Sequence, residues 1–126
     1  MDNDGALADL AVRGIAVARV AIGVGATLSP RLVSRLQFGT TSPAQTITVR
    51  MLGARDLALG LGALLAARHG SSGLRGWVEA GALADGVDAL AILRGGPAAS
   101  RRRGLTVLVA GGSAAVSVWA ARILAD

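Results

Sequence analysis

The sequence predicts an all-α protein, a bundle of four transmembrane helices with a short amphipathic interfacial segment between the first two. Hydrophobic residues make up 52% of the 126 residues, charged residues only 17%, and the mean hydropathy is +0.56. This composition is unusual for a soluble domain. The small apolar residues Ala and Gly are abundant, which lets helices approach closely in lipid. The period-two alternation typical of strands is absent. We therefore expect one helical domain over residues 1–126.

Turn-forming residues divide the chain into four segments of helical length. The breaks at residues 28–43, 69–73 and 94–100 are rich in the Gly, Pro and Ser that interrupt helices. The predicted helices cover about residues 6–28, 44–68, 74–93 and 104–124.

Separate sequence observations support the predictions for the first helix, the first connection and the last helix. Acidic rather than basic residues precede the first helix, so we expect it to be retained and not cleaved as a secretory signal. Residues 30–38, PRLVSRLQF, place apolar residues and arginines on opposite sides of a short helix that could lie among lipid headgroups. An ordinary polar connector explains this segment equally well. Residues 104–121 contain no charge and approach the roughly 20 residues that span a bilayer.

The distribution of arginine predicts the orientation in the plasma membrane. The net charge is +5, and the run 101–103 could indicate nucleic-acid binding, but it directly precedes the uncharged stretch and is more simply a cytoplasmic anchor. We therefore expect no nucleic-acid partner. The first and third connections carry six arginines against three at the other end, which predicts a multi-pass protein with both termini outside. Trp77 and Trp119 then share the outer interface.

Five charged residues fall near the middles of predicted helices. Each would cost about 2.5 to 3.5 kcal/mol if it faced lipid, and the sum exceeds what a small bundle can offset. We therefore expect these residues to face inward and to pair with one another. Arg50 and Glu79 lie nearer the helix ends and are expected to extend the network. The five central residues are Arg19, Arg55, Asp56, Asp85 and Asp88.

Helical spacing places these charges among small residues. Neighbours three and four positions apart share one face of a helix. Arg55 lies about 100° around the helix from Asp56, so we expect it to reach another helix, with Asp85 or Asp88 as its partner. The predicted stripes are Ala16, Arg19, Gly23 and Ala26; Gly53, Asp56, Gly60 and Ala63; and Trp77, Gly81, Asp85 and Asp88.

Three motifs carry a family resemblance. They are P-x-L-V-x-R-L from Pro30, G-A-R-D-x-x-L-G from Gly53 and G-x-L-A-D-G-V-D-A-L from Gly81. Over residues 16–93 the chain resembles small four-helix bacterial membrane proteins of an actinobacterial type, which are distantly DoxX-like. The resemblance implies a four-helix membrane bundle and carries no activity to this chain. DoxX-like proteins have been linked to redox partners, but this chain has no cysteine.

The buried charges leave several functional hypotheses open. The network could bind or conduct a small ligand or ion, or it could belong to an accessory subunit of a membrane complex. In an alternative hypothesis, the protein is a membrane-embedded acid/base enzyme of the isomerase, cyclase or epoxide hydrolase type. The other alternative is a soluble four-helix bundle. Asp85 and Asp88 are the catalytic candidates, and the binding candidates are Arg19, Arg50, Arg55, Asp56 and Glu79.

Metals and cofactors are not expected. The chain has no cysteine, and its single histidine, His69, lies in a predicted connection without a second ligand nearby. The G-x-G pairs lie inside predicted helices and do not form a phosphate-binding loop. The expected partners are the lipid bilayer, a lipophilic small molecule, and a second copy or another membrane protein.

Overall fold

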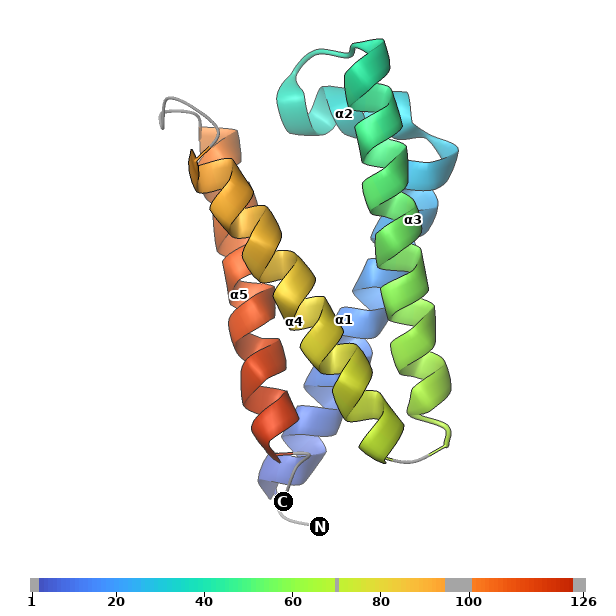
Figure 1. Cartoon of the computed structure of the whole chain (residues 1–126), viewed down its shortest axis with the longest axis vertical. Coiled ribbons are helices and arrows are strands. Elements are labelled where there is room, and N and C mark those ends of the chain that lie inside the picture. The colour runs from blue at the N-terminus through green and yellow to red at the C-terminus, as the bar shows by residue number, and fades with distance from the viewer. Residues whose placement is uncertain (1–2, 70, 95–100, 124–126) are drawn as a thin grey trace.

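The computed structural model describes residues 3–69, 71–94 and 101–123, and all of its regular elements are helices (Figure 1). This confirms the prediction of an all-helical bundle. No helix in the described ranges is long and apolar enough to cross a membrane. The elements are α1 (Asn3–Leu28), α2 (Pro30–Phe38), α3 (Pro43–Ala66), α4 (Ser71–Arg94) and α5 (Arg101–Ile123).

The residues at the ends of α2 and α3 explain where these helices begin and end. Pro30 opens α2, and Gly39 closes it with a left-handed φ of 79°, which glycine adopts without steric cost. The Ser42 hydroxyl accepts a hydrogen bond from the Gln45 backbone N–H at 3.1 Å and caps α3. The amphipathic segment predicted at residues 30–38 is therefore a helix. The α5 helix begins at Arg101, so the arginine run belongs to its first turn and not to the preceding connection.

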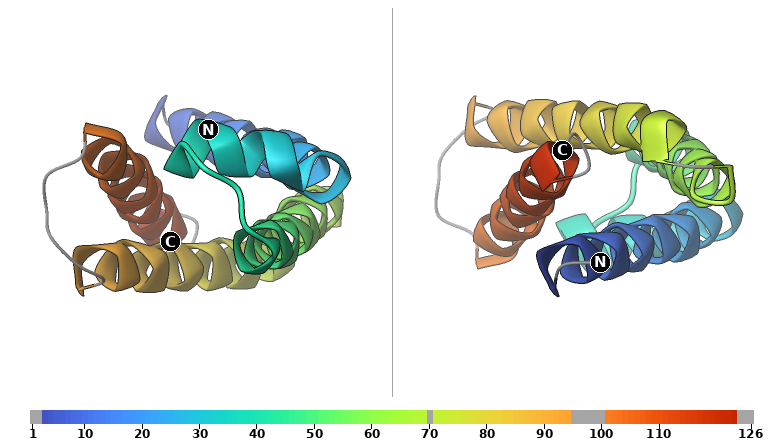
Figure 2. Two further views of the ribbon diagram at one scale, coloured as in Figure 1. Left: turned by 90° about the horizontal axis from the view of Figure 1, so that it is seen from above. Right: turned by 90° about the horizontal axis from the view of Figure 1, so that it is seen from below.

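The four long helices form two antiparallel pairs. The most extensive packing joins α1 to α3 and α4 to α5. The two pairs meet at the end of the bundle where α1 begins and α5 ends, which we call the closed end. They diverge toward the opposite end, where α2 lies, which we call the open end (Figure 1). Seen along the long axis, α1 and α4 lie on opposite sides of the bundle, with α3 at one edge and α5 at the other (Figure 2). The main apolar core occupies the closed end and comprises Ala8, Val12, Ala16, Ala63, Leu74, Val78, Ala120 and Ala121.

Glycine determines how closely α1 and α3 approach. A Cβ atom on Gly23 would lie 2.5 Å from the Leu57 backbone nitrogen, and one on Gly60 would lie 2.7 Å from the Ala16 carbonyl oxygen. Helix backbones pack this closely only where one residue has no side chain. The stripes predicted on these two helices are confirmed in large part, because Ala16, Arg19, Gly23 and Ala26 are buried on α1, and Gly53, Gly60 and Ala63 on α3.

The surface carries many of the larger apolar side chains. The buried hydrophobic residues are mostly alanines and valines, whereas large hydrophobic side chains are exposed along each of the five helices. Examples are Leu10, Ile22, Leu32, Leu61, Leu83 and Leu108.

Candidate functional site

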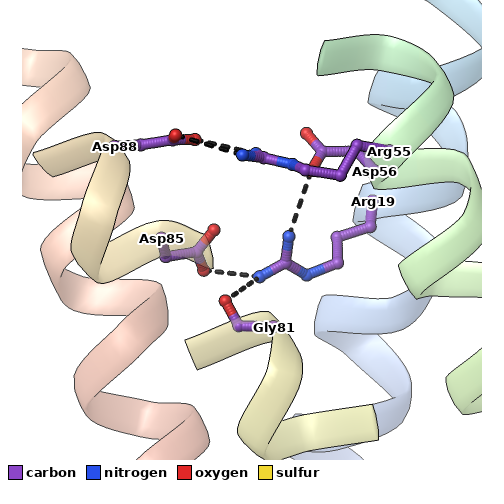
Figure 3. Close-up of polar contacts among 6 residues, drawn as sticks. All are labelled: Arg19, Arg55, Asp56, Gly81, Asp85 and Asp88. Atoms are coloured by element: carbon purple, nitrogen blue, oxygen red, sulfur yellow. Dashed lines mark hydrogen bonds and ion pairs between the residues drawn. The ribbon is translucent and has the colours of Figure 1, made fainter. Parts of the chain in front are cut away.

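Arg19 is the centre of a charge network that joins three helices. It extends from α1, and its Nη1 donates to Asp56 Oδ1 on α3 at 3.2 Å. Its Nη2 donates to Asp85 Oδ2 on α4 at 2.5 Å and to the Gly81 carbonyl oxygen at 3.2 Å. The side chains of Arg19 and Asp85 are each only 10% exposed. One guanidinium group therefore connects the α1·α3 pair to α4 (Figure 3).

Arg55 extends the network toward the open end. It lies on α3 and donates to both carboxylate oxygens of Asp88, at 3.0 and 2.7 Å. This two-point contact is the strongest geometry available to an arginine and a carboxylate. Nη2 of Arg55 also donates to Asp56 Oδ1 at 3.1 Å. The predicted contact with α4 is therefore confirmed, while the expectation that Arg55 would bypass its neighbour Asp56 is wrong, because its long side chain folds back across one position.

The five residues form one chain of alternating charge, in the order Asp85, Arg19, Asp56, Arg55, Asp88. Small residues make room for it. The guanidinium of Arg19 lies over Gly81, where a Cβ atom would be 3.1 Å from Nη2. A side chain at this position would crowd the guanidinium against Asp85. The glycine on the predicted α4 stripe thus serves the network and not only helix packing.

A cleft opens above the network, between the α1·α3 pair and the α4·α5 pair. Its volume is about 320 Å³, and all five network residues line it. The short helix α2 contributes Val33 and Gln37 where the pairs diverge. The apolar walls include Ile15, Ile22, Leu52, Val109 and Ala110, and the uncharged polar groups are Gln37, Thr106 and Ser113.

Two of the predicted site residues lie elsewhere. Arg50 is exposed on α3 and joins none of the ion pairs found among the described residues. Glu79 is paired with Arg75 one turn earlier on α4, where both side chains are about half exposed. Neither residue lines the cleft. The expected extension of the network through Arg50 and Glu79 is not found.

Sequence reasoning did not identify the contributions of α2 and α5 to the cleft. Thr106 and Ser113 are seven positions apart on α5, which places them on one face of that helix. This spacing was a usable signal in a segment otherwise notable only for lacking charge. No comparable signal marked Gln37, because its place in the cleft depends on how α2 packs across the ends of α1 and α3.

The contacts of the two catalytic candidates do not fit the role of a general acid. A general acid needs a proton to give, whereas Asp85 and Asp88 both accept hydrogen bonds from guanidinium groups through their carboxylate oxygens. Within the described ranges, no group of three or more His, Asp or Glu side chains is placed to hold a metal ion. The network combines fixed charges with an adjoining apolar volume, which suits a ligand with one polar end.

Comparisons with known proteins place no relative beside this chain. No family model, no curated protein and no solved structure matches it. The resemblance to DoxX-like membrane proteins therefore stays a prediction.

Proposed function

We propose that this protein is a small helical membrane protein that binds a lipophilic small molecule in the cleft, with the Arg/Asp network as the polar end of the site. One observation carries the proposal: all five charges of the network line a cleft whose remaining walls are mainly apolar. Such a combination of apolar walls and a few convergent polar groups is typical of small-molecule sites. A network that only joined helices would need no such volume beside it.

The distribution of side chains supports a location in the bilayer. Charged residues such as Arg19 and Asp85 make α1 and α4 polar when the whole helix is averaged, yet these charges are turned inward and paired. Large apolar side chains are exposed on the outer surface of every helix. Lipid would cover these side chains at no cost, whereas their exposure to water is unfavourable. Among the exposed charges, Arg13 and Arg75 are each paired with a carboxylate one turn away.

The proposed orientation has both termini outside. The beginning of α1 and the end of α5 lie at the closed end of the bundle. The arginines of α2, Arg31 and Arg35, are exposed at the open end, as is Arg94 at the end of α4. Basic residues concentrate on the cytoplasmic side of membrane proteins. The cleft would then open toward the cytoplasmic leaflet.

Membrane association is tested by fractionation. We expect the tagged chain to stay in the membrane pellet after an alkaline carbonate wash and to be released by mild detergent. Recovery in the aqueous supernatant at neutral pH, as a monodisperse species, would instead identify the soluble four-helix bundle and contradict the membrane part of the proposal.

Ligand binding is tested by extracting and identifying what co-purifies with the chain. Ala110→Phe fills the cleft from α5, and Ala115→Phe is its matched control, because Ala115 is exposed on the same helix and does not line the cleft. We expect mass spectrometry to find the same small molecule in stoichiometric amount in wild-type and Ala115→Phe preparations and to find it depleted in Ala110→Phe. Retention of that molecule by Ala110→Phe would contradict binding in the cleft.

An accessory subunit of a membrane complex is the second candidate. It is favoured by the way both guanidinium groups are engaged by carboxylates across helix boundaries, since buried charges often fix the arrangement of helices. In that case the chain in mild-detergent extracts should migrate on native gels as part of a larger complex with another protein. Migration as a free monomer or a homo-oligomer would exclude this role.

A further inference from the structure

The described lining of the cleft carries an unbalanced charge. Three carboxylates, those of Asp56, Asp85 and Asp88, face two guanidinium groups, those of Arg19 and Arg55, and the other described residues that line the cleft are uncharged. With all five groups ionised, this described lining has one net negative charge. A charge beside an apolar volume is costly unless it is neutralised.

The uncommitted acceptors lie at the inner part of the network. Arg55 occupies both oxygens of Asp88. Among the described residues no hydrogen bond reaches Oδ1 of Asp85 or Oδ2 of Asp56, because the arginines contact only the other oxygen of each carboxylate. The side chain of Asp85 is nine-tenths buried, and in Figure 3 the dashed line from Arg19 ends on only one of its two oxygens. Asp85 thus combines burial with a free acceptor.

A proton or a cationic ligand could supply the missing positive charge, and the cleft favours the ligand. A proton needs no volume, whereas the cleft offers about 320 Å³ with apolar walls that include Ile15, Ile22 and Val109. An ammonium group contacting Asp85 and Asp56 would leave its attached hydrocarbon against these walls. The charge and the shape of the cleft are then satisfied by the same molecule.

We propose that the ligand of the cleft is a monocationic amphiphile, with its positively charged group between Asp85 and Asp56 and its apolar body against Ile15, Ile22 and Val109. This inference rests on the proposed function, since it names the class of ligand for the same cleft. It excludes anionic amphiphiles, because a second negative charge would meet Asp85 and Asp56, the terminal nitrogens of Arg55 are already engaged, and its Nε, which has no partner among the described residues, is buried.

Three probes with the same alkyl chain test the class of ligand without any substitution. They are decyltrimethylammonium, decanol and decyl sulfate, and their saturable binding is measured on the wild-type chain in nanodiscs of neutral lipid after subtraction of empty nanodiscs. We expect decyltrimethylammonium to bind one per chain and with a Kd about tenfold or more below that of decanol. Decyl sulfate should bind most weakly.

The outcomes separate the two proposals. Equal binding of the three probes, or tightest binding of decyl sulfate, would overturn the cationic class while leaving an apolar binding cleft in place. Saturable binding of none of the three probes would overturn the binding function and the class of ligand together.

A pair of charge-matched variants tests the position of the cationic group. Asp85→Asn removes the inner carboxylate, and Asp9→Asn removes one from an exposed pair with Arg13 outside the cleft. We expect Asp85→Asn to weaken decyltrimethylammonium binding about tenfold or more and to change decanol binding less than about twofold. Asp9→Asn should change neither value. Equal losses for both probes in Asp85→Asn would show a purely structural role and overturn the assignment. If Asp85→Asn does not fold, Asp56→Asn, which removes the other carboxylate assigned to the cationic group, tests the position with the same two probes and the same expected losses.

Discussion

The contact between α1 and α3 and the contact between the two helix pairs are built in opposite ways. Inside the α1·α3 pair, glycines let the backbones touch, and a Cβ atom on Gly53 would lie 2.6 Å from that of Ala26. Between the pairs, long charged side chains such as Arg19 cross the gap and end on carboxylates. Small residues remove the space between helices, whereas paired charges hold helices together at a distance. The cleft exists where the second kind of contact replaces the first.

The largest effect is expected from breaking the α1·α3 contact. In Gly23→Leu, the new Cβ atom would lie 2.5 Å from the Leu57 nitrogen and 2.7 Å from the Gly53 carbonyl oxygen. Both obstacles are backbone atoms, so the helices themselves must separate. We expect a loss of about 5 kcal/mol or more, enough to prevent folding of a small domain. Circular dichroism during urea unfolding in mild detergent measures this loss.

Gly14→Leu is the matched control for that variant. Gly14 lies on the same helix, and a Cβ atom there would have no neighbour within 4 Å. We expect this variant to keep or slightly raise stability, since leucine forms helices better than glycine. If the two variants were equally stable, close backbone approach would not be what holds α1 to α3.

The next largest effect is expected from removing the centre of the network. Arg19→Met keeps much of the side-chain length but leaves Asp85 and Asp56 without the guanidinium that joins them. Loss of one partner from a buried ion pair typically costs about 3 to 5 kcal/mol, and we expect a loss of that size in the free energy of unfolding. The double variant Arg19→Met/Asp85→Asn should recover part of it, because it also removes the uncompensated charge. A double variant no more stable than Arg19→Met would contradict this explanation.

A smaller loss is expected at the outer part of the network. The side chains of Arg55 and Asp88 are 32% and 31% exposed, about three times as much as those of Arg19 and Asp85. Polar surroundings can partly replace the guanidinium of Arg55, so we expect Arg55→Met to lower the unfolding free energy by about 1 to 2 kcal/mol. The same urea titration compares the two methionine variants. A larger loss for Arg55→Met than for Arg19→Met would reverse the ranking of the two arginines.

The sequence predicted the buried faces of the helices better than it predicted the cleft. The stripe of Ala16, Arg19, Gly23 and Ala26 follows from helical spacing and the cost of exposing a charge, both of which are local properties. Arg50 could have been excluded on the same grounds, since it lies about 140° around the helix from Arg55. Likewise, the four-residue spacing of Arg75 and Glu79 already indicated a pair on one helix.

The cleft could not be predicted in this way. Its size depends on the angle at which the two helix pairs diverge and on the position of α2, and both result from packing between segments distant in sequence. The contact of Arg55 with Asp56 also depends on side-chain conformation, which a helical wheel does not include. The charged residues of the site were therefore predictable, whereas the volume they enclose was not.

The smallest effect is expected for the exposed pair of Arg75 and Glu79, and it sharpens the comparison with the buried network. This pair is as short as many buried ones, 2.8 Å from Nε to Oε1, but both side chains are about half exposed. A double-mutant cycle with Arg75→Ala and Glu79→Ala should therefore give a coupling energy of only about 0.3 to 0.5 kcal/mol, as is usual for exposed pairs one turn apart. The equivalent cycle with Arg19→Met and Asp85→Asn should exceed about 1.5 kcal/mol, because charged hydrogen bonds are stronger when buried. Equal coupling energies would mean that burial beside the cleft does not strengthen the network, and that its charges are no better placed than surface charges to hold the two helix pairs together.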